Sequence, residues 1–157
     1  MKVRTPMLVA FVLVGLCALY SPGFLHAQLG IGVWVRQPTT TTPGEMTMTV
    51  ETCCNGGRRL TYNFKIGTDT FVMIVDSPLN GAEVPVLLNG KPSGETMAIK
   101  RVDELHLEAV LKMDGQMFGT SKSTLSADGK TLTVENNITF AAAGQTIGKQ
   151  VEVWKKK

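Results

Sequence analysis

Apolar and polar residues alternate along most of this chain with a period of two. In the segment RLTYNFKI (59–66) every second residue is apolar, namely Leu60, Tyr62, Phe64 and Ile66. Such alternation is typical of half-buried β-strands. No segment of ten or more residues has the 3.6-residue spacing of an amphipathic helix. The chain is therefore predicted to be all-β.

Short segments of this kind recur along the chain, separated by turn residues. Those that fit strands are 33–36, 45–52, 59–66, 70–75, 84–88, 96–101, 104–112, 118–125, 130–136 and 149–155. The apolar run 70–75 is consistent with a strand buried on both faces. Tight hairpin turns are indicated at Asn80-Gly81, Asn89-Gly90, Asp114-Gly115 and Asp128-Gly129. We predict an antiparallel up-and-down meander of about 8–10 strands closed as a barrel, with a β-sandwich as the alternative.

Residues 1–27 have the layout of a secretory signal peptide. Lys2 and Arg4 are followed by an apolar run over residues 7–20, and Ala27 is a small residue at the expected cleavage position. The run has about 14 residues, fewer than the roughly 20 that span a bilayer as a helix. An uncleaved anchor and a lipoprotein modified at Cys17 are the alternatives. We expect an exported protein, periplasmic or extracellular, with a single β-barrel domain over residues 28–157.

The remaining residues restrict the function. The removed segment carries two basic residues and no acidic one, so the formal charge falls from +3 to +1. No basic surface then indicates nucleic acid, and we expect no stable membrane span once the signal is removed. His106 would be the single histidine, and Cys53 and Cys54 the only cysteines. With so few histidines and cysteines, few combinations of catalytic or metal-binding side chains are possible.

Both ends of the predicted domain resemble those of lipocalins and fatty-acid-binding proteins, the calycin barrels. GVW (32–34) opens the first predicted strand, and the chain closes with VEVWKKK (151–157). Calycins open with a Gly-x-Trp strand and close with a basic residue that caps the tryptophan. The resemblance implies these structural roles for Trp34 and for Lys155 or Lys156, of which we assign Lys155. The chain lacks the Arg-x-Tyr pair with which fatty-acid-binding proteins hold a carboxylate.

A second resemblance covers almost the whole chain after residue 27. KRVDE (100–104), STLSADGKTLTVENN (123–137) and the terminal VEVWKK are similar to a group of small, uncharacterised secreted bacterial β proteins. Members of that group share a Lys-Arg-Val-Asp turn, a Ser-x-Asp-Gly-Lys-Thr-Leu-Thr segment and a final Val-x-Val-Trp-x-Lys strand. The resemblance implies a fold and no activity.

Cys53 and Cys54 are adjacent in a permissive CCNGG segment. Neighbouring α-carbons lie about 3.8 Å apart, below the usual disulfide range of about 4.4–6.8 Å. Exported thiols nevertheless tend to be oxidised. A vicinal disulfide, an intermolecular bridge and two free thiols all remain open, and we favour the first. A metal would need more ligands than two thiols and the distant His106, so we expect no metal.

The sequence offers few candidate catalytic residues. His106 lies between leucines on a predicted strand and should face solvent, and the chain has no Gly-x-Ser-x-Gly nucleophile segment. Asp103, Glu104 and Glu108 could provide paired carboxylates for a glycosidase, but Glu104 and Glu108 share the solvent face of their strand. We predict no catalytic residue, no cofactor and a non-enzymatic protein.

The predicted interior is rich in methionine and aromatic residues. Methionine adapts to irregular ligands, and a barrel of about eight strands is just wide enough for one small ligand. The candidate ligand-binding residues are Met48, Tyr62, Phe64, Phe71, Met73 and Met97; Met46, Met113, Met117 and Phe118 are further interior candidates. We expect a carrier or sensor of a small apolar ligand. The alternative is that these residues simply fill the core of an envelope-associated structural or interaction module whose protein partner is unknown.

The signal-peptide interpretation predicts the start of the exported chain. Cleavage after Ala27 leaves Gln28 as the first residue, because signal peptidases cut after a small residue that follows the apolar run. Intact-mass spectrometry of exported protein should find this start. A mass that includes residues 7–27 would contradict the export prediction.

Overall fold

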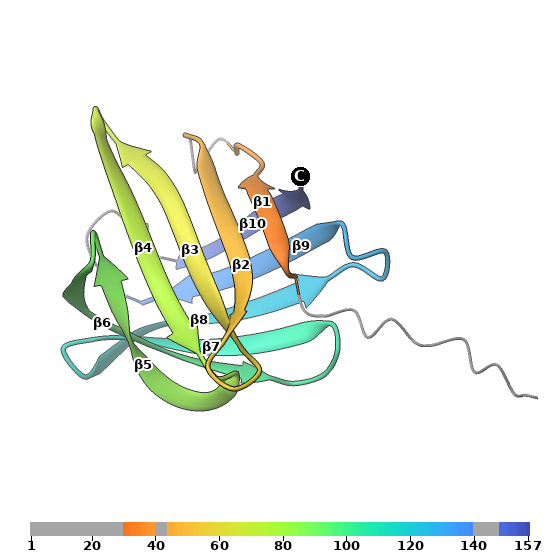
Figure 1. Cartoon of the computed structure of the whole chain (residues 1–157). Coiled ribbons are helices and arrows are strands. Elements are labelled where there is room, and N and C mark those ends of the chain that lie inside the picture. Colours follow the sequence, from red (N-terminus) through yellow and green to blue (C-terminus); the bar gives the residue numbers. More distant parts are fainter. Residues whose placement is uncertain (1–29, 40–43, 140–147) are drawn as a thin grey trace, which may run out of the picture.

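The computed structural model describes residues 30–39, 44–139 and 148–157, which form ten strands and no helix (Figure 1). Residues 1–27, where the signal peptide is predicted, lie outside the described residues. The strands are β1 (Gly32–Arg36), β2 (Met46–Cys53), β3 (Gly57–Ile66), β4 (Asp69–Ser77), β5 (Asn80–Leu88), β6 (Lys91–Arg101), β7 (His106–Met113), β8 (Gln116–Leu125), β9 (Thr131–Ile138) and β10 (Gly148–Lys156). Each predicted strand segment overlaps one of them.

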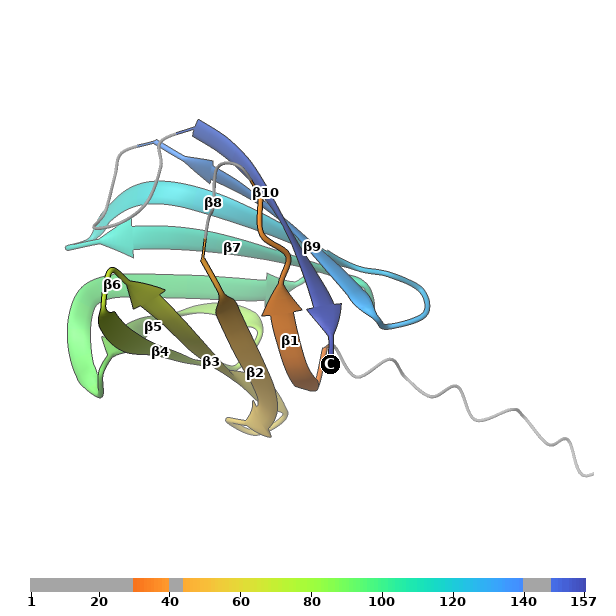
Figure 2. The same ribbon diagram turned by 90° about the horizontal axis from the view of Figure 1, so that it is seen from above.

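The ten strands form a closed antiparallel barrel in which every strand pairs with its sequence neighbours and β1 pairs with β10. The predicted meander barrel is thus confirmed, and the sandwich alternative is wrong. Strands β1–β4 run steeply in Figure 1, and β7–β10 cross behind them at a large angle. Figure 2, seen from above, shows the two groups of strands on opposite sides of the interior.

Three of the four predicted turns lie between strands. Asn89 and Gly90 join β5 to β6 with φ angles of 49° and 77°, and Asp114-Gly115 joins β7 to β8 in the same way. Positive φ at both central residues is the geometry of a tight hairpin. Asp128-Gly129 lies in the connection between β8 and β9.

The turn predicted at Asn80-Gly81 is wrong. These residues begin β5, and the chain turns just before them, at Leu79, whose φ is 60°. The side chain of Asn80 accepts a hydrogen bond of 2.9 Å from the backbone N–H of Ala82, and the pairing with β6 shifts between Asn80 and Glu83. A β-bulge therefore accommodates the glycine that the sequence pattern assigns to a turn.

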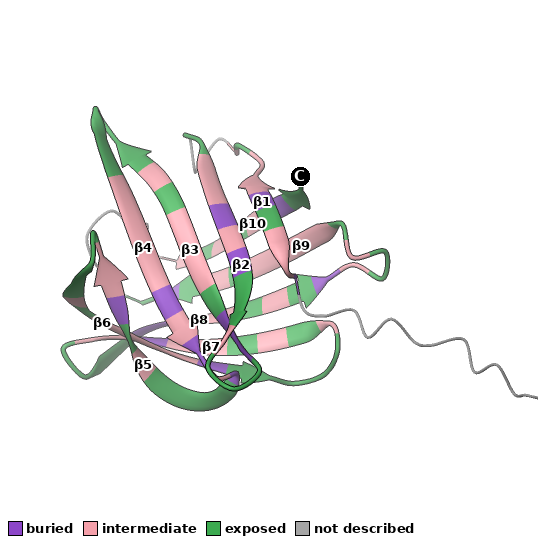
Figure 3. Ribbon diagram, viewed as in Figure 1, coloured by how far each residue is buried: buried purple, intermediate pink, exposed green. Residues whose placement is uncertain are grey.

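Two expectations about burial also need correction. Segment 70–75 in β4 is not buried on both faces, because a barrel wall is one layer thick; Val75 is fully buried, whereas Val72 and Ile74 are half-buried on the outer face. Figure 3 accordingly shows burial in separate bands along each strand. Met117, an expected interior residue, is instead 56% exposed. The β7–β8 register shifts at Phe118, because Leu111 pairs with Gly119 and Lys112 with Met117. This bulge reverses the alternation beyond it, so the fully buried Phe118 faces the interior and Met117 faces outward.

Two tryptophans close one end of the barrel, here called the tryptophan end, which also carries the β2–β3, β4–β5, β6–β7 and β8–β9 connections. Trp34 of β1 and Trp154 of β10 are 0% and 2% exposed. They pack in one cluster with Met48, Val50 and Leu125. The indole N–H of Trp34 donates a hydrogen bond to the carbonyl of Gly30, so its one polar atom is satisfied. This end of the interior is filled.

The lysine over Trp34 is Lys156, not Lys155. Its Nζ lies 5.8 Å from the ring centroid of Trp34, because Trp34 and Lys156 are directly opposite each other in the β1–β10 register. Lys155 points to the other face and donates to Thr131 Oγ1 at 2.7 Å. The same contact accounts for Gly32, where a Cβ would lie 2.8 Å from Lys156 Cε and φ is +130°. The Gly-x-Trp segment therefore leaves room for the capping lysine.

Replacement of Trp34 by alanine should strongly destabilise the domain. Loss of a buried tryptophan costs about 3–5 kcal/mol in free energy of unfolding, against a typical total of about 5–15 kcal/mol for a domain. Chemical denaturation of Trp34→Ala and Val33→Ala measures the effect. Val33 neighbours Trp34 on the outer face and is 39% exposed, so its variant should change stability far less. Equal stability of the two variants would contradict the assigned role of Trp34.

Candidate ligand-binding site

A cavity of about 730 Å³ occupies the barrel interior. It begins beside Trp34 and extends to the end opposite the tryptophans, where the exposed residues Glu45, Lys65 and Ile66 border it. Binding pockets for small molecules commonly have volumes of about 300–1,000 Å³. The interior is thus large enough for a small organic molecule.

All six predicted ligand-binding residues line this cavity: Met48, Tyr62, Phe64, Phe71, Met73 and Met97. Strand alternation and register bring them together, since Tyr62 is opposite Met73, and Phe64 is opposite Phe71. The rings of Phe64 and Phe71 stack with centroids 5.6 Å apart. Tyr62 contacts the ring of Trp154 edge-on at 6.0 Å. These contacts hold the aromatic side chains at defined positions in the wall.

One side of the cavity is formed mainly by apolar side chains from β2, β3 and β4. We call this surface the apolar wall; its residues are Met46, Met48, Val50, Leu60, Phe64, Phe71 and Met73. Five of its seven residues are methionine or phenylalanine, and methionine side chains adapt to different shapes. This wall can bury the apolar part of a ligand.

Sequence reasoning missed a second group of cavity residues, which lie on β8, β9 and β10. We call it the polar wall; its members are Ser121, Ser123, Asn136, Gln150 and Glu152. The signal was present in the alternation, because Ser121 and Ser123 share a strand face with the core residue Leu125, and Glu152 shares one with Trp154. Polar residues at inward positions of a strand line a cavity as readily as apolar ones of the same parity.

An ion pair joins the polar wall to β1. Arg36 Nη1 lies 3.3 Å from Glu152 Oε1, and both side chains are mostly buried, at 11% and 15% exposure. Arg36 Nη2 donates to the carbonyl of Gly44 at 3.3 Å. Glu152 Oε2 accepts a hydrogen bond of 3.2 Å from the indole N–H of Trp154. Each charge is thus opposed by the other inside the barrel, as burial of charged groups requires.

Other titratable groups also line the cavity, among them the buried Arg58 on β3, whose pKa is lowered by burial and secondarily by the charge of Arg101. Burial, and secondarily the negative charge of Glu152, raises the pKa of Tyr62, so its phenol stays protonated at neutral pH. Burial also raises the pKa of Glu95, which lies on β6. These shifts follow from the cost of charging a group that is removed from water.

The catalytic candidates do not converge on the cavity. His106, Asp103 and Glu104 lie outside it, and Glu108 borders it but is exposed and lies 3.3 Å from Lys122 Nζ. His106 is exposed, and its Nδ1 lies 2.8 Å from Asp103 Oδ1. Asp103 also accepts a hydrogen bond from the backbone N–H of Leu105, and these contacts, led by that of Leu105, lower its pKa. The pair stabilises the β6–β7 connection. Glu104 and Glu108 are exposed as predicted.

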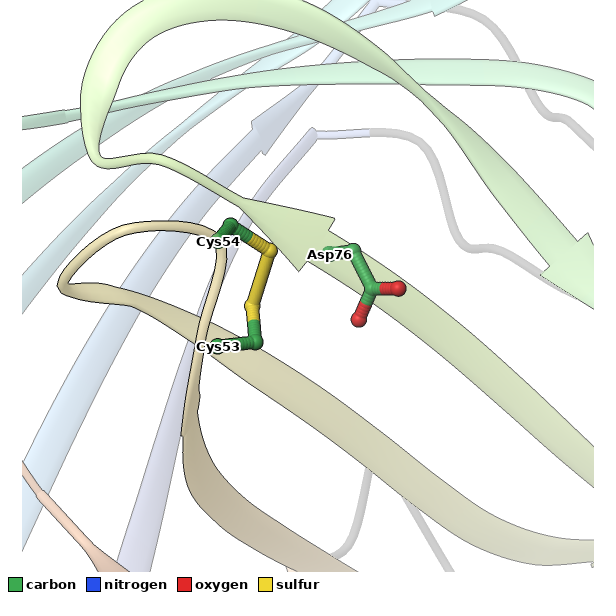
Figure 4. Close-up of side chains that lie close together, drawn as sticks. All are labelled: Cys53, Cys54 and Asp76. Atoms are coloured by element: carbon green, nitrogen blue, oxygen red, sulfur yellow. A yellow bond between two sulfur atoms is a disulfide. The ribbon is translucent and has the colours of Figure 1, made fainter.

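Cys53 and Cys54 are bonded to each other in the β2–β3 connection (Figure 4). Cys54 and Asn55 both have positive φ angles, 51° and 54°. Asp76 lies beside the two sulfurs, within 4.8 Å, but its carboxylate receives two hydrogen bonds of 2.7 Å from Arg59. In this oxidised form the sulfurs are not thiolates and Asp76 is already paired, so the cluster lacks the ligands that a metal site needs.

The barrel is similar to solved structures of the fluorescent protein UnaG. Two variants of UnaG match with TM-scores of 0.56 and 0.55, identities of 13% and 15%, and coverage of 81% and 80% of this chain and of 95% and 94% of theirs. Wild-type UnaG matches with a TM-score of 0.52 at 14% identity, over 81% of this chain and 96% of its own. No protein-family model and no curated protein matches the sequence. In the described part of the chain no helix is long and apolar enough to cross a membrane.

Reduction of the Cys53–Cys54 bond should leave the fold intact. The bond closes a loop without intervening residues, and the stabilisation by a disulfide grows with loop length. Intact mass should rise by about two hydrogens on a monomer, and the melting temperature should stay nearly constant. A Cys53→Ser/Cys54→Ser variant should melt like the reduced protein. A dimer that dissociates on reduction would instead show that the cysteines bridge two chains.

The similarity to UnaG extends over most of both chains, and at this level of identity it shows the fold. The fold of this chain is a calycin-like ten-stranded barrel.

Proposed function

We propose that this protein is an exported, non-enzymatic barrel that binds a small, largely apolar molecule in its interior. The observation that carries the proposal is the cavity of about 730 Å³ lined by methionine and aromatic side chains. Export is supported by the signal-peptide pattern of residues 1–27. The calycin-like fold supports an interior site because barrels of this width can enclose one small ligand.

The distribution of the core favours binding over plain core filling. Apolar clusters fill the tryptophan end, around Trp34 and around Val75, and a third cluster surrounds Phe118. Between and beyond them the inward side chains of β2–β4 leave the cavity open. A protein interior is normally packed with few voids larger than a water molecule. A cavity of this size therefore indicates a place for another molecule.

The neutral apolar dye Nile red tests the interior site. Its fluorescence should rise and shift to shorter wavelength in the presence of the protein, because the dye moves from water into an apolar cavity. Met97→Trp should lower the affinity by about tenfold, since the larger side chain takes up cavity volume and overpacking costs about 1–3 kcal/mol.

Met117→Trp is the matched control. Met117 is on β8 and 56% exposed on the outside of the barrel, so the same substitution there should leave the dye affinity unchanged. Equal effects of the two variants would place the dye on the surface. The absence of any dye binding by the folded protein would contradict the proposal and favour the interaction module.

A further inference from the structure

We propose that the ligand is an amphiphile whose polar part is an uncharged hydrogen-bonding group and not a carboxylate. This polar part lies against the polar wall. The inference deepens the proposed function and rests on it. It concerns Ser121, Ser123, Asn136, Gln150 and Glu152, with Arg36 and Tyr62 as their neighbours in the cavity.

Three members of the polar wall form one row across the strands because they are in register. Ser121 of β8 is directly opposite Asn136 of β9, and Asn136 is directly opposite Gln150 of β10. Directly opposite residues of an antiparallel pair have Cβ atoms about 4.5–5.5 Å apart. Ser123 and Glu152 lie two residues along from Ser121 and Gln150, on the same faces. Val134 lies between Ser123 and Glu152. Three strands therefore present a polar row to the interior, with two further polar side chains beside it.

Several side chains of this wall have hydrogen-bonding capacity to spare. In the parts of the chain that the structure describes, Ser121, Ser123 and Asn136 line the cavity without a side-chain hydrogen bond to protein. A serine hydroxyl and an asparagine amide both donate and accept. Their polar atoms are accessible within the cavity, and a ligand that covered them without hydrogen bonding would leave them unpaired at a cost. Hydroxyl, carbonyl or amide groups of a ligand would satisfy these side chains, whereas a pure hydrocarbon would not.

The charge of the polar wall is already balanced. The carboxylate of Glu152 and the guanidinium of Arg36 oppose each other at 3.3 Å, and the second oxygen of Glu152 is bound by the Trp154 indole. A ligand carboxylate beside Glu152 would meet a like charge where screening by water is weak. A neutral polar group avoids this repulsion. The protonated phenol of Tyr62 faces the same cavity and adds another neutral hydrogen-bonding group.

The opposite side of the cavity fits the rest of such a molecule. The apolar wall is made of uncharged side chains, and its methionines and phenylalanines can surround an alkyl chain or a ring. The charged residues Arg58 and Lys65, which also border the cavity, lie near the two ends of β3 and outside this wall. The two walls together fit a ligand with an apolar body and hydrogen-bonding groups along one side. The recognised chemistry is that of a fatty amide or alcohol, not of a fatty acid.

Competition against Nile red with dodecanamide and dodecanoate tests the inference. The two probes share chain length and differ in the charge of the head group at pH 7.5, and both are used below their aggregation concentrations. Dodecanamide should displace the dye at a concentration about tenfold lower than dodecanoate, a ratio equivalent to about 1.4 kcal/mol. Equal displacement, or stronger displacement by dodecanoate, would overturn the inference and leave the proposed function standing.

Two variants assign the selectivity to the polar wall. Glu152→Gln leaves Arg36 without its counter-charge, so dodecanoate should bind about tenfold more tightly and the selectivity should vanish or reverse. Glu135→Gln is the matched control, since Glu135 is exposed on the outer face of β9. Asn136→Leu should weaken dodecanamide binding several-fold more than dye binding. Unchanged selectivity in folded Glu152→Gln would overturn the inference.

The failures of the two proposals are distinguishable. If Nile red and both probes fail to bind the folded wild-type protein, the interior site itself is wrong. If the dye binds and the amide shows no advantage, only the inference about the polar group is wrong. Should Glu152→Gln not fold, the ratio measured on the wild-type protein still decides between these outcomes.

Discussion

Pairing of β1 with β10 is the contact on which the rest of this structure depends. It joins the two ends of a ten-stranded meander through Trp34, Val35 and Arg36, opposite Lys156, Lys155 and Trp154. Without it the sheet would have two exposed edges, which invite pairing with other chains. Once it forms, each strand has an inner and an outer face. Every second residue of a regular strand then faces the interior.

Closure also brings together a packed cluster around the two tryptophans. Trp34 and Trp154 come from the paired strands themselves, and their cluster fills the tryptophan end. The capping lysine, the glycine that admits it and the hydrogen bond from Trp34 to Gly30 are parts of the same arrangement. The buried clusters around Trp34, Val75 and Phe118 stabilise the barrel, so the interior between them can stay open. A cavity in the middle of a domain otherwise costs free energy through lost packing contacts.

The difference between the two cavity walls follows from which strands each wall uses. The apolar wall on β2–β4 is rich in methionine and phenylalanine, whereas the inner faces of β8–β10 add serine, asparagine, glutamine and glutamate to apolar residues such as Leu132 and Val134. Polar side chains at inward positions contribute little to a packed core and destabilise it when unpaired. They suit a surface that meets a ligand or water. The buried ion pair of Arg36 and Glu152 keeps this surface near electrical neutrality.

Much of this arrangement could be predicted from the sequence, because strand alternation and hairpin turns are local properties. The ten strands, the antiparallel meander and the inward direction of Met48, Tyr62, Phe64, Phe71, Met73 and Met97 follow from a period of two and from Asn-Gly and Asp-Gly pairs. Tertiary structure alone decided the features that depend on register. Lys156 faces Trp34 because of the β1–β10 pairing, and bulges displace the expected turn at Gly81 and turn Met117 outward. The polar wall joins three strands, and its ion pair joins residues 116 positions apart. Local patterns carry no information about such partners, since the distance between them is set only when the barrel closes.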